Sequence, residues 1–365
     1  MTIHNPGELI GNRYEIINYI SEGGMQEVYA ANDTLLTRRV ALKTPKTNSA
    51  RKRFHRSAST SASINHSNVA KTLDYLEEND RYYLIEELIE GTDLGQALRE
   101  NFDRLDPYLC AHVLHHLAKG LAASHHAGVV HRDLKPSNIM VAGGMAFNGI
   151  KITDFGIAKM AEAELAVVDG GDEEALTQSA TALGALPYMA PEMIDSFTNA
   201  TRPADVWSIG ALTFELLSGA KPFGTGYRAV PAIQAAIIPP LPPELLAKPQ
   251  FAELARNIYG LIQRCLRKDP GERPTADALV RLCEELCYSV KERRIGTVGY
   301  MPYQTQGFIG SPLEADVFFH QDSVPVGRVT SGDRVWFSTF PGEPRERAFP
   351  VVPLKAIRRA RPARQ

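Results

Sequence analysis

The hydrophobic pattern of this 365-residue chain changes character twice, and this change limits the folds that the chain can adopt. Residues 14–88 carry short β-branched and aromatic runs that are typical of strands, interrupted by one helical pattern at residues 51–64. Longer helical patterns follow after Asp93, at residues 107–126, 205–217, 251–267 and 276–294. Beyond residue 295 short strand patterns return between glycines and prolines, which favours a small all-β barrel. We therefore predict an α+β protein with a β-rich lobe, a helical lobe and a barrel.

These changes of pattern also predict the domain boundaries. We expect residues 1–290 to form a two-lobed unit, with a first lobe at about residues 10–88 and a second at about residues 91–288. Residues 291–355 are expected to form the barrel, and residues 356–365, which contain four arginines, a basic tail. A cleft between two lobes is a natural ligand site, so we expect the functional site where the lobes join.

Charge and composition restrict the environment and the partners of the chain. Residues 291–365 contain 12 Lys and Arg against 7 Asp and Glu, whereas residues 1–290 contain 28 against 35. The positive excess at the C-terminal end favours an anionic partner there. No run approaches the roughly 20 apolar residues that span a bilayer, and the N-terminus lacks a secretion pattern. We therefore expect a cytoplasmic protein without membrane association.

The four cysteines, at positions 110, 265, 283 and 287, form neither a disulfide pattern nor a zinc pattern. Cys283 and Cys287 would lie one turn apart on the helix predicted at residues 276–294, where they could contribute to a metal site. No second pair of histidines or cysteines has suitable spacing. We therefore favour packing or a free thiol over a metal site.

One eight-residue sequence, HRDLKPSN, combines a base, a cation and a metal ligand. Within it Asp133 can accept the proton of an attacking hydroxyl, Lys135 can neutralise charge on a transferring phosphoryl group, and Asn138 offers an amide oxygen to a metal. Further along, Asp154 of the sequence DFG adds a hard carboxylate of the kind that Mg²⁺ prefers. Upstream, Lys43 ends the strand-like sequence VALK and is expected to point at the α- and β-phosphates of a phosphate donor. The set indicates phosphoryl transfer.

In this order the motifs resemble those of the protein kinase family, specifically the bacterial Hanks-type enzymes that are similar to eukaryotic serine/threonine kinases. The resemblance covers about residues 10–288. It implies a bilobal kinase fold, ATP with Mg²⁺ or Mn²⁺ as cofactors, and proteins with Ser or Thr as substrates. It also implies that Asp205 anchors the backbone of the HRDLKPSN loop. Glu192 of the sequence APE is expected to pair with Arg273.

The same resemblance predicts the residues that contact the nucleotide. Adenine is expected to bond the backbone of Glu87 and Ile89 between the lobes. The glycine-rich hairpin keeps the family's central glycine at Gly23, but Ser21 and Gln26 replace the first and third glycines, which makes the phosphate cradle bulkier. The complete set comprises Ser21, Gly23, Gly24, Val28, Ala41, Lys43, Glu86, Glu87, Ile89 and Met140.

The usual partner of Lys43 is missing from this sequence. In relatives a glutamate on the following helix pairs with this lysine, but Ser57 stands at that position and no acidic residue occurs between residues 44 and 71. The alignment also places Glu86 at the back of the ATP pocket, where an unpaired carboxylate would be costly. We hypothesise that Glu86 replaces the helix glutamate. The alternative is that Glu86 points to water or that the register is off by one.

Another departure is Ala185, which stands where serine/threonine kinases usually have a threonine that bonds the catalytic aspartate and lysine. Its absence weakens the positioning of Asp133 and Lys135. Two alternatives to an active kinase therefore stay open. The chain could be a pseudokinase-type scaffold that binds ATP without efficient transfer, or a regulator that acts mainly through its barrel.

The long loop between Gly156 and Ala190 contains hydroxyl residues near its end. Thr177 and Ser179 resemble the autophosphorylated stretch of bacterial relatives, and we predict autophosphorylation there. Arg132 is the cation that would hold the added phosphate.

The C-terminal segment resembles a cold-shock domain, an OB-type five-stranded barrel. The sequence DVFFH at residues 316–320 matches the second nucleic-acid-binding strand of that family. Phe308, Phe318 and His320 are expected to stack on bases, each worth roughly 1–3 kcal/mol, whereas Tyr300 replaces the usual tryptophan. We expect the barrel to bind single-stranded RNA or DNA. Alternatively its aromatics are partly core and its surface docks the kinase or a protein partner.

Overall fold

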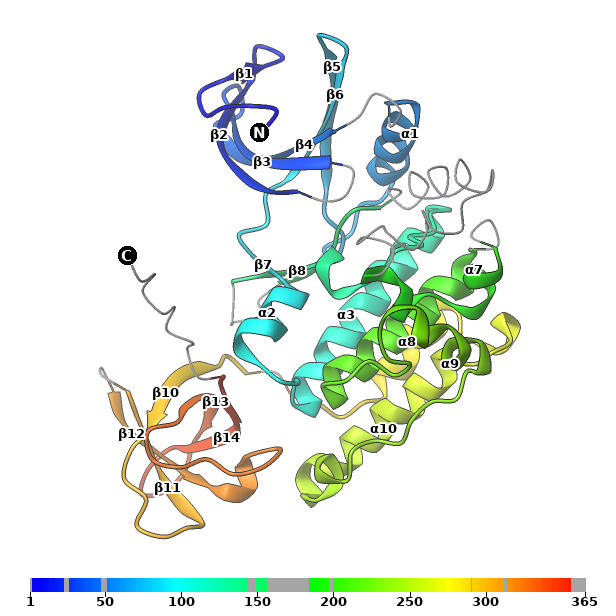
Figure 1. Cartoon of the computed structure of the whole chain (residues 1–365). Coiled ribbons are helices and arrows are strands. Elements are labelled where there is room, and N and C mark those ends of the chain that lie inside the picture. Colours follow the sequence, from blue (N-terminus) through cyan, green and yellow to red (C-terminus); the bar gives the residue numbers. More distant parts are fainter. Residues whose placement is uncertain are drawn as a thin grey trace, which may run out of the picture.

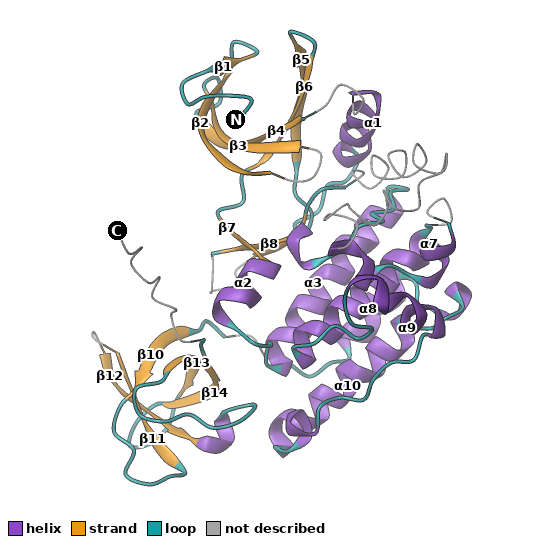
Figure 2. Ribbon diagram, viewed as in Figure 1, coloured by secondary structure: helices purple, strands orange, loops and turns teal. Residues whose placement is uncertain are grey.

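The computed structural model describes residues 2–22, 26–46, 51–143, 147, 149–155, 184–196, 200–289, 291–311 and 314–355. Within them the chain forms a β-rich N-lobe, a helical C-lobe and a C-terminal barrel, in the order expected from the sequence (Figure 1, Figure 2). Gly23 and Gly24, the loop with Thr177 and Ser179, and residues 356–365 lie outside the described residues.

A six-stranded sheet forms the N-lobe, in the strand order β1-β2-β3-β4-β6-β5. The strands are β1 (Leu9–Ile10), β2 (Tyr14–Glu22), β3 (Gln26–Asp33), β4 (Arg38–Pro45), β5 (Thr72–Glu78) and β6 (Arg81–Glu87). Alternate residues such as Tyr29, Leu42 and Ile85 are completely buried in one cluster. Helix α1 (Arg51–Ala62) packs through Phe54 on Leu84, which points to the other face of the sheet.

Helices build the C-lobe around one large hydrophobic cluster. The helices are α2 (Leu94–Asn101), α3 (Pro107–His126), α7 (Pro191–Asp195), α8 (Arg202–Ser218), α9 (Val230–Ala235), α10 (Pro249–Cys265) and α11 (Ala276–Glu284). Single 3₁₀ turns are η2 (Pro136–Asn138), η4 (Leu186–Tyr188), η6 (Gly226–Ala229), η7 (Pro243–Leu246) and η8 (Pro270–Glu272). Among the described residues, no helix has the length and apolar character needed to cross a membrane.

Two local features organise the C-lobe and its junction with the N-lobe. Helix α3 begins as predicted because the Asp106 carboxylate accepts hydrogen bonds from the backbone N–H groups of Tyr108 and Leu109, and Pro107 suits the first helical position. A three-stranded sheet of β7 (Gly91–Asp93), β8 (Ile139–Ala142) and β9 (Gly149–Ile152) lies where the two lobes meet (Figure 2). This sheet and α2 were not predicted from the sequence.

Helix α11 is shorter than the sequence predicts. The pattern predicts a helix to residue 294, whereas α11 ends at Glu284 and β10 begins at Arg294. The preceding Arg293 pairs instead with the buried carboxylate of Asp106, 2.6 Å away, which outweighs helix propensity.

The prediction that Cys283 and Cys287 share a helix is therefore wrong. Cys283 is buried, Cys287 is exposed, and both are free thiols. In the part of the chain that the structure describes, no group of three or more His, Cys, Asp or Glu side chains could hold a metal ion.

Five strands close the C-terminal barrel in the order β10-β11-β12-β14-β13. They are β10 (Arg294–Val298), β11 (Gln306–Ser311), β12 (Glu314–His320), β13 (Arg334–Phe340) and β14 (Arg347–Pro353), with the 3₁₀ turn η9 (Gln321–Ser323) after β12. Val335 and Phe337 of β13 belong to the core of the barrel. Trp336 lies between them on the opposite face and belongs to the cluster of the C-lobe.

Candidate active site

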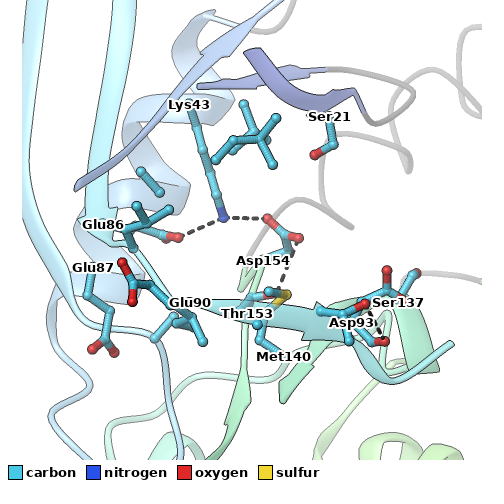
Figure 3. A pocket seen from close by; sticks show the side chains of 18 of the residues that line it. Ser21, Lys43, Glu86, Glu87, Glu90, Asp93, Ser137, Met140, Thr153 and Asp154 are labelled. Atoms are coloured by element: carbon cyan, nitrogen blue, oxygen red, sulfur yellow. Dashed lines mark hydrogen bonds and ion pairs between the residues drawn. The ribbon is translucent and has the colours of Figure 1, made fainter. Parts of the chain in front are cut away.

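A cavity of about 670 Å³ lies between the lobes, beside the segment that joins them. Side chains from both lobes line it (Figure 3). They include most of the predicted nucleotide contacts, namely Ser21, Val28, Ala41, Lys43, Glu86, Glu87, Ile89 and Met140, together with Asp154. Strand pairing explains the convergence, because β3, β4 and β6 are neighbours in one sheet, and β8 pairs with the strand that precedes Asp154.

Lys43 lies between two carboxylates in this cavity (Figure 3). Its Nζ is 2.6 Å from Oε2 of Glu86 and 2.7 Å from Oδ1 of Asp154. Ala41 pairs directly with Glu86 across β4 and β6, so Lys43 and Glu86 are diagonal neighbours on one face of the sheet. The side chains of Lys43 and Glu86 are only 7% and 6% exposed. The hypothesised ion pair is confirmed, and the alternative in which Glu86 points to water is wrong.

Burial and charge act against each other in this group. Burial raises the pKa of Glu86, and the attraction of Lys43 offsets this only in part. Burial also acts to raise the pKa of Asp154, but Lys43 outweighs it and the pKa of Asp154 is lowered. Burial disfavours the charge of Lys43, yet Asp154 and Glu86 together raise its pKa. The lysine is therefore a firmly held cation at neutral pH.

Helix α1 contacts the site through a serine, not through an acidic residue. The side chain of Ser57 lies outside the described side chains. One turn further, the buried Ser61 donates a hydrogen bond of 3.2 Å from its hydroxyl to the backbone carbonyl of Phe155. The helix is thus tied to the residue that follows Asp154. Nothing in the sequence distinguished Ser61 from its neighbouring serines.

Asp205 of α8 fixes the loop that carries Asp133. Its completely buried carboxylate accepts hydrogen bonds from the backbone N–H groups of His131 at 2.8 Å and Arg132 at 2.7 Å. The contact predicted for Asp205 is confirmed. Arg132 and Asp154 have positive φ angles of 69° and 62°, which non-glycine residues adopt only where their surroundings impose them.

Asp133, Lys135 and Asn138 form a connected group at the end of that loop. The Nζ of Lys135 is 2.8 Å from Oδ2 of Asp133. The Asn138 amide donates from Nδ2 to the backbone carbonyl of Asp133 at 2.7 Å and to its Oδ2 at 3.1 Å. These bonds turn Oδ1 of Asn138 away from Asp133. The amide oxygen of Asn138 and the carboxylate of Asp154 are hard oxygen ligands. Such ligands suit Mg²⁺ or Mn²⁺ when the phosphates of a nucleotide supply part of the coordination.

Gln26 is a site residue whose contact sequence reasoning missed. The sequence marks it only as the replacement of a glycine, yet its Nε2 donates a 3.1 Å hydrogen bond to Oδ1 of Asp154. The side chain is buried, and its Oε1 has no hydrogen-bond partner. The β2–β3 hairpin is therefore linked to the aspartate of the C-lobe. The one sequence signal for this contact was a polar residue at a position where the family has glycine.

The segment that leads into α7 is fixed to the C-lobe by a bidentate ion pair. Two nitrogens of Arg273 lie 2.7 and 2.8 Å from the carboxylate of Glu192, which confirms the predicted pair. Ala185, a few residues earlier, is buried and supplies no hydroxyl to Asp133 or Lys135.

The barrel brings the aromatic residues singled out in its sequence onto two adjacent strands. Phe308 of β11 pairs with Phe318 of β12, and their ring centroids are 5.9 Å apart. The guanidinium of Arg345 lies 5.5 Å from the centre of the Phe308 ring. His320 lies on the same side of β12 as Phe318, and its ring pairs with Asp322 at 3.0 Å. Tyr300 is 72% exposed.

Comparison with known proteins gives the same picture for the two lobes. The protein kinase domain family matches residues 14–282, which includes the cavity and ends before β10. The chain is 32% identical to the serine/threonine-protein kinase PrkC of Bacillus subtilis over 272 residues, which are 73% of this chain and 39% of PrkC. It is 34% identical to the serine/threonine-protein kinase PknA of Mycobacterium tuberculosis over 291 residues, which are 75% of this chain and 62% of PknA.

A probable serine/threonine-protein kinase of Corynebacterium glutamicum, PknB, is 32% identical over 274 residues, which are 73% of this chain and 40% of PknB. The chain thus spans less than half the length of PrkC and PknB. Because the family match covers most of the chain, the chain belongs to the protein kinase domain family.

Proposed function

We propose that this chain is an ATP-dependent protein serine/threonine kinase. The observation that carries the proposal is the buried cation of Lys43, held between Glu86 and Asp154 in a cavity between two lobes. Protein kinases require a strand lysine paired with a glutamate and an aspartate that binds the metal. Here the glutamate comes from β6, so the arrangement is complete without an acidic residue on α1.

The charged and polar groups of the site then have roles in phosphoryl transfer. Lys43 orients the α- and β-phosphates. Asn138 and Asp154 would hold Mg²⁺ or Mn²⁺, which neutralises phosphate charge when bound. Asp133 orients the hydroxyl of a substrate Ser or Thr and accepts its proton, while Lys135, 2.8 Å from Asp133, compensates charge on the phosphoryl group.

In the segment that joins the lobes, the backbone of Glu87 can offer adenine an acceptor but not a donor. The backbone N–H of Glu87 already donates to the carbonyl of Lys71 at 2.9 Å. Adenine would therefore meet the carbonyl of Glu87, as an acceptor for its amino group, and the backbone of Ile89. Met140 of β8, which also lines the cavity, would contact the face of the base that lies toward the C-lobe.

A pseudokinase-type scaffold is the second candidate for the two lobes. Two observations favour it: Ala185 supplies no hydroxyl, and Oδ1 of Asp154 is engaged by both Lys43 and Gln26. Incorporation of labelled phosphate from ATP into a mixed protein substrate separates the two. Transfer by the wild type that is lost in Asp133→Ala supports the kinase. Nucleotide binding without transfer by either protein supports the scaffold.

The kinase proposal includes autophosphorylation at Thr177 and Ser179. What supports it is the sequence of the loop and the position of Arg132, whose backbone is fixed by Asp205 beside the catalytic residue. Phosphopeptide mapping of protein incubated with ATP tests it. We expect phosphate on this loop in the wild type and none in Asp133→Ala, and an unmodified loop in active enzyme contradicts the proposal.

We also propose that the barrel is a cold-shock-like OB barrel that binds single-stranded RNA or DNA. The strand order with β14 between β12 and β13, and the pairing of Phe308 with Phe318 beside Arg345, support this proposal. Binding of a labelled oligonucleotide should weaken with salt. It should be lost in Phe318→Ala but not in Tyr227→Ala, a half-exposed tyrosine of the C-lobe. Binding that survives Phe318→Ala contradicts the proposal.

A further inference from the structure

Buried aromatic side chains form the contact between the barrel and the C-lobe. Trp336 of β13 is 2% exposed, and its ring centroid lies 5.3 Å from that of Phe102 and 5.8 Å from that of Phe147. Phe349 of β14 stacks on Phe251 of α10, with centroids 5.2 Å apart. Buried aromatic side chains dominate the energetics of such contacts. The barrel is therefore packed firmly against the C-lobe, next to α2 and α10 (Figure 1).

A buried ion pair fixes the orientation of this contact. Arg293, just before β10, places two nitrogens 2.6 and 3.0 Å from the carboxylate of Asp106, and the two side chains are 3% and 1% exposed. Asp106 is also the residue that caps α3. The guanidinium of Arg293 lies 4.4 Å from the centre of the Trp336 ring. Breaking a pair this deeply buried is costly, so the barrel keeps one position.

The end of the barrel reaches the C-terminal end of α2. The backbone N–H of Lys355 donates to the carbonyl of Asn101 at 3.0 Å. Its Nζ donates to the carbonyls of Leu98 at 2.9 Å and Arg99 at 3.3 Å, and lies 3.2 Å from Oδ1 of Asp103. The last carbonyls of a helix lack partners within the helix and carry partial negative charge. Lys355 thus places a cation at the carbonyl end of α2, where the carbonyl of Leu98 also accepts a 3.3 Å hydrogen bond from the backbone N–H of Phe102.

The other end of α2 forms part of the cavity between the lobes. Asp93 caps the helix by accepting a 2.9 Å hydrogen bond from the backbone N–H of Gln96, and both side chains line the cavity. A Cβ added at Gly95 would lie 3.4 Å from Pro136, so the first turn of α2 packs closely on the loop of Asp133. A helix of eight residues is marginal by itself, so contacts at its two ends decide where it lies.

We propose that Lys355 is a positioning residue for the nucleotide site, which acts from the barrel through α2. By holding the carbonyl end of α2, it keeps Asp93 and Gln96 in place in the cavity and the first turn of α2 against the loop of Asp133. The barrel is then a structural part of the nucleotide site. This inference rests on the proposed function only in requiring that the cavity binds a nucleotide.

The test compares full-length wild type with Lys355→Met, Lys355→Arg and a matched control, Arg294→Met. The Arg294 side chain is 31% exposed, as is that of Lys355, but its ion pair with Glu346 stays within the barrel at 3.0 Å. Affinity for a fluorescent ATP analogue with Mg²⁺, KM for ATP, kcat and the melting temperature are measured for each protein. We expect Lys355→Met to weaken nucleotide affinity and raise KM by about three- to fivefold, with kcat changed less than about twofold.

Lys355→Arg, which keeps the cation, should restore nucleotide affinity, and Arg294→Met should leave it unchanged. Wild-type affinity and KM in Lys355→Met overturn the inference. So does an equal loss in Arg294→Met, or a loss of affinity accompanied by a fall in melting temperature that the control does not show. If the wild type transfers no phosphate, the proposed kinase function fails, and the direct affinity measurement alone decides the role of Lys355.

Discussion

Replacing Glu86 by glutamine is the sharpest test of how this site works. The substitution keeps the size of the side chain and removes the charge that lies 2.6 Å from the Nζ of Lys43. Lys43 then retains Asp154 as its carboxylate partner, at 2.7 Å. The lysine is drawn toward the residue that is proposed to bind the metal and is no longer held where it meets the α- and β-phosphates.

The magnitude follows from the burial of the pair. Removing one partner of a buried ion pair costs about 3–5 kcal/mol, and because Asp154 remains we take the lower end, about 3 kcal/mol. At about 1.4 kcal/mol per factor of ten, kcat/KM should fall about 100-fold, as severely as in Lys43→Ala. The control is Glu346→Gln, which removes an exposed ion pair with Arg294 at 3.0 Å and should change kcat/KM less than about twofold.

The assay is initial-rate transfer of labelled phosphate to protein substrate over a range of ATP concentrations, with folding checked by thermal unfolding. Near-normal turnover in Glu86→Gln, with Lys43→Ala inactive, would refute the reasoning. The ion pair would then be a packing feature of the sheet, and another group would have to position Lys43 during transfer.

Three further predictions concern the catalytic base, the barrel contact and the pH dependence. Asp133→Asn should lower kcat by about 10²–10⁴-fold and leave the affinity for an ATP analogue within about twofold, measured by initial rates and equilibrium binding. Trp336→Ala should lower the free energy of unfolding by about 3–5 kcal/mol, measured in denaturant, whereas Tyr300→Ala, at a 72% exposed site, should not. Because burial raises the pKa of Glu86 above 4.5, acidification should break its pair with Lys43 above that pH, so the acid limb of the kcat/KM profile should disappear in Glu86→Gln. Conversely, the contribution of Glu86 to unfolding free energy is largest below pH 4.5 and falls as the pH rises through its folded-state pKa.

The sequence was informative where local chemistry decides the structure. Helix α3 has the predicted bounds, because Asp106 and Pro107 are strong start signals. The Lys43–Glu86 pair was also accessible, because a buried glutamate without a partner and a lysine without its usual partner pointed to each other. In both cases the residues carry the information themselves.

The sequence failed where a distant contact overrides local preference. The pattern of charged residues before Arg294 predicts a helix. Instead Arg293 forms an ion pair with Asp106, 187 positions away, which overrides that preference. In the sequence Trp336 is one more residue of an alternating strand pattern. Such a pattern cannot show that both faces of β13 are buried, one in the barrel and one against the C-lobe. Strand β14 is obscured by Pro350 and Pro353, since proline inside a run argues against a strand.

Placing the partner of Lys43 on β6 changes which movements can control the site. In kinases whose glutamate lies on the helix after the lysine strand, movement of that helix makes or breaks the ion pair. Here β4 and β6 are adjacent in the sheet, with Lys43 opposite Leu84 and Ala41 opposite Glu86, so their backbone pairing fixes the two side chains together. A shift of α1 cannot separate them. The parts left to respond are α1, whose Ser61 bonds the carbonyl of Phe155, the start of β3, where Gln26 bonds Asp154, and α2, which Lys355 holds from the barrel. Asp93 and Gln96, at the start of α2, line the cavity, so control through α2 is expected to change KM for ATP more than kcat.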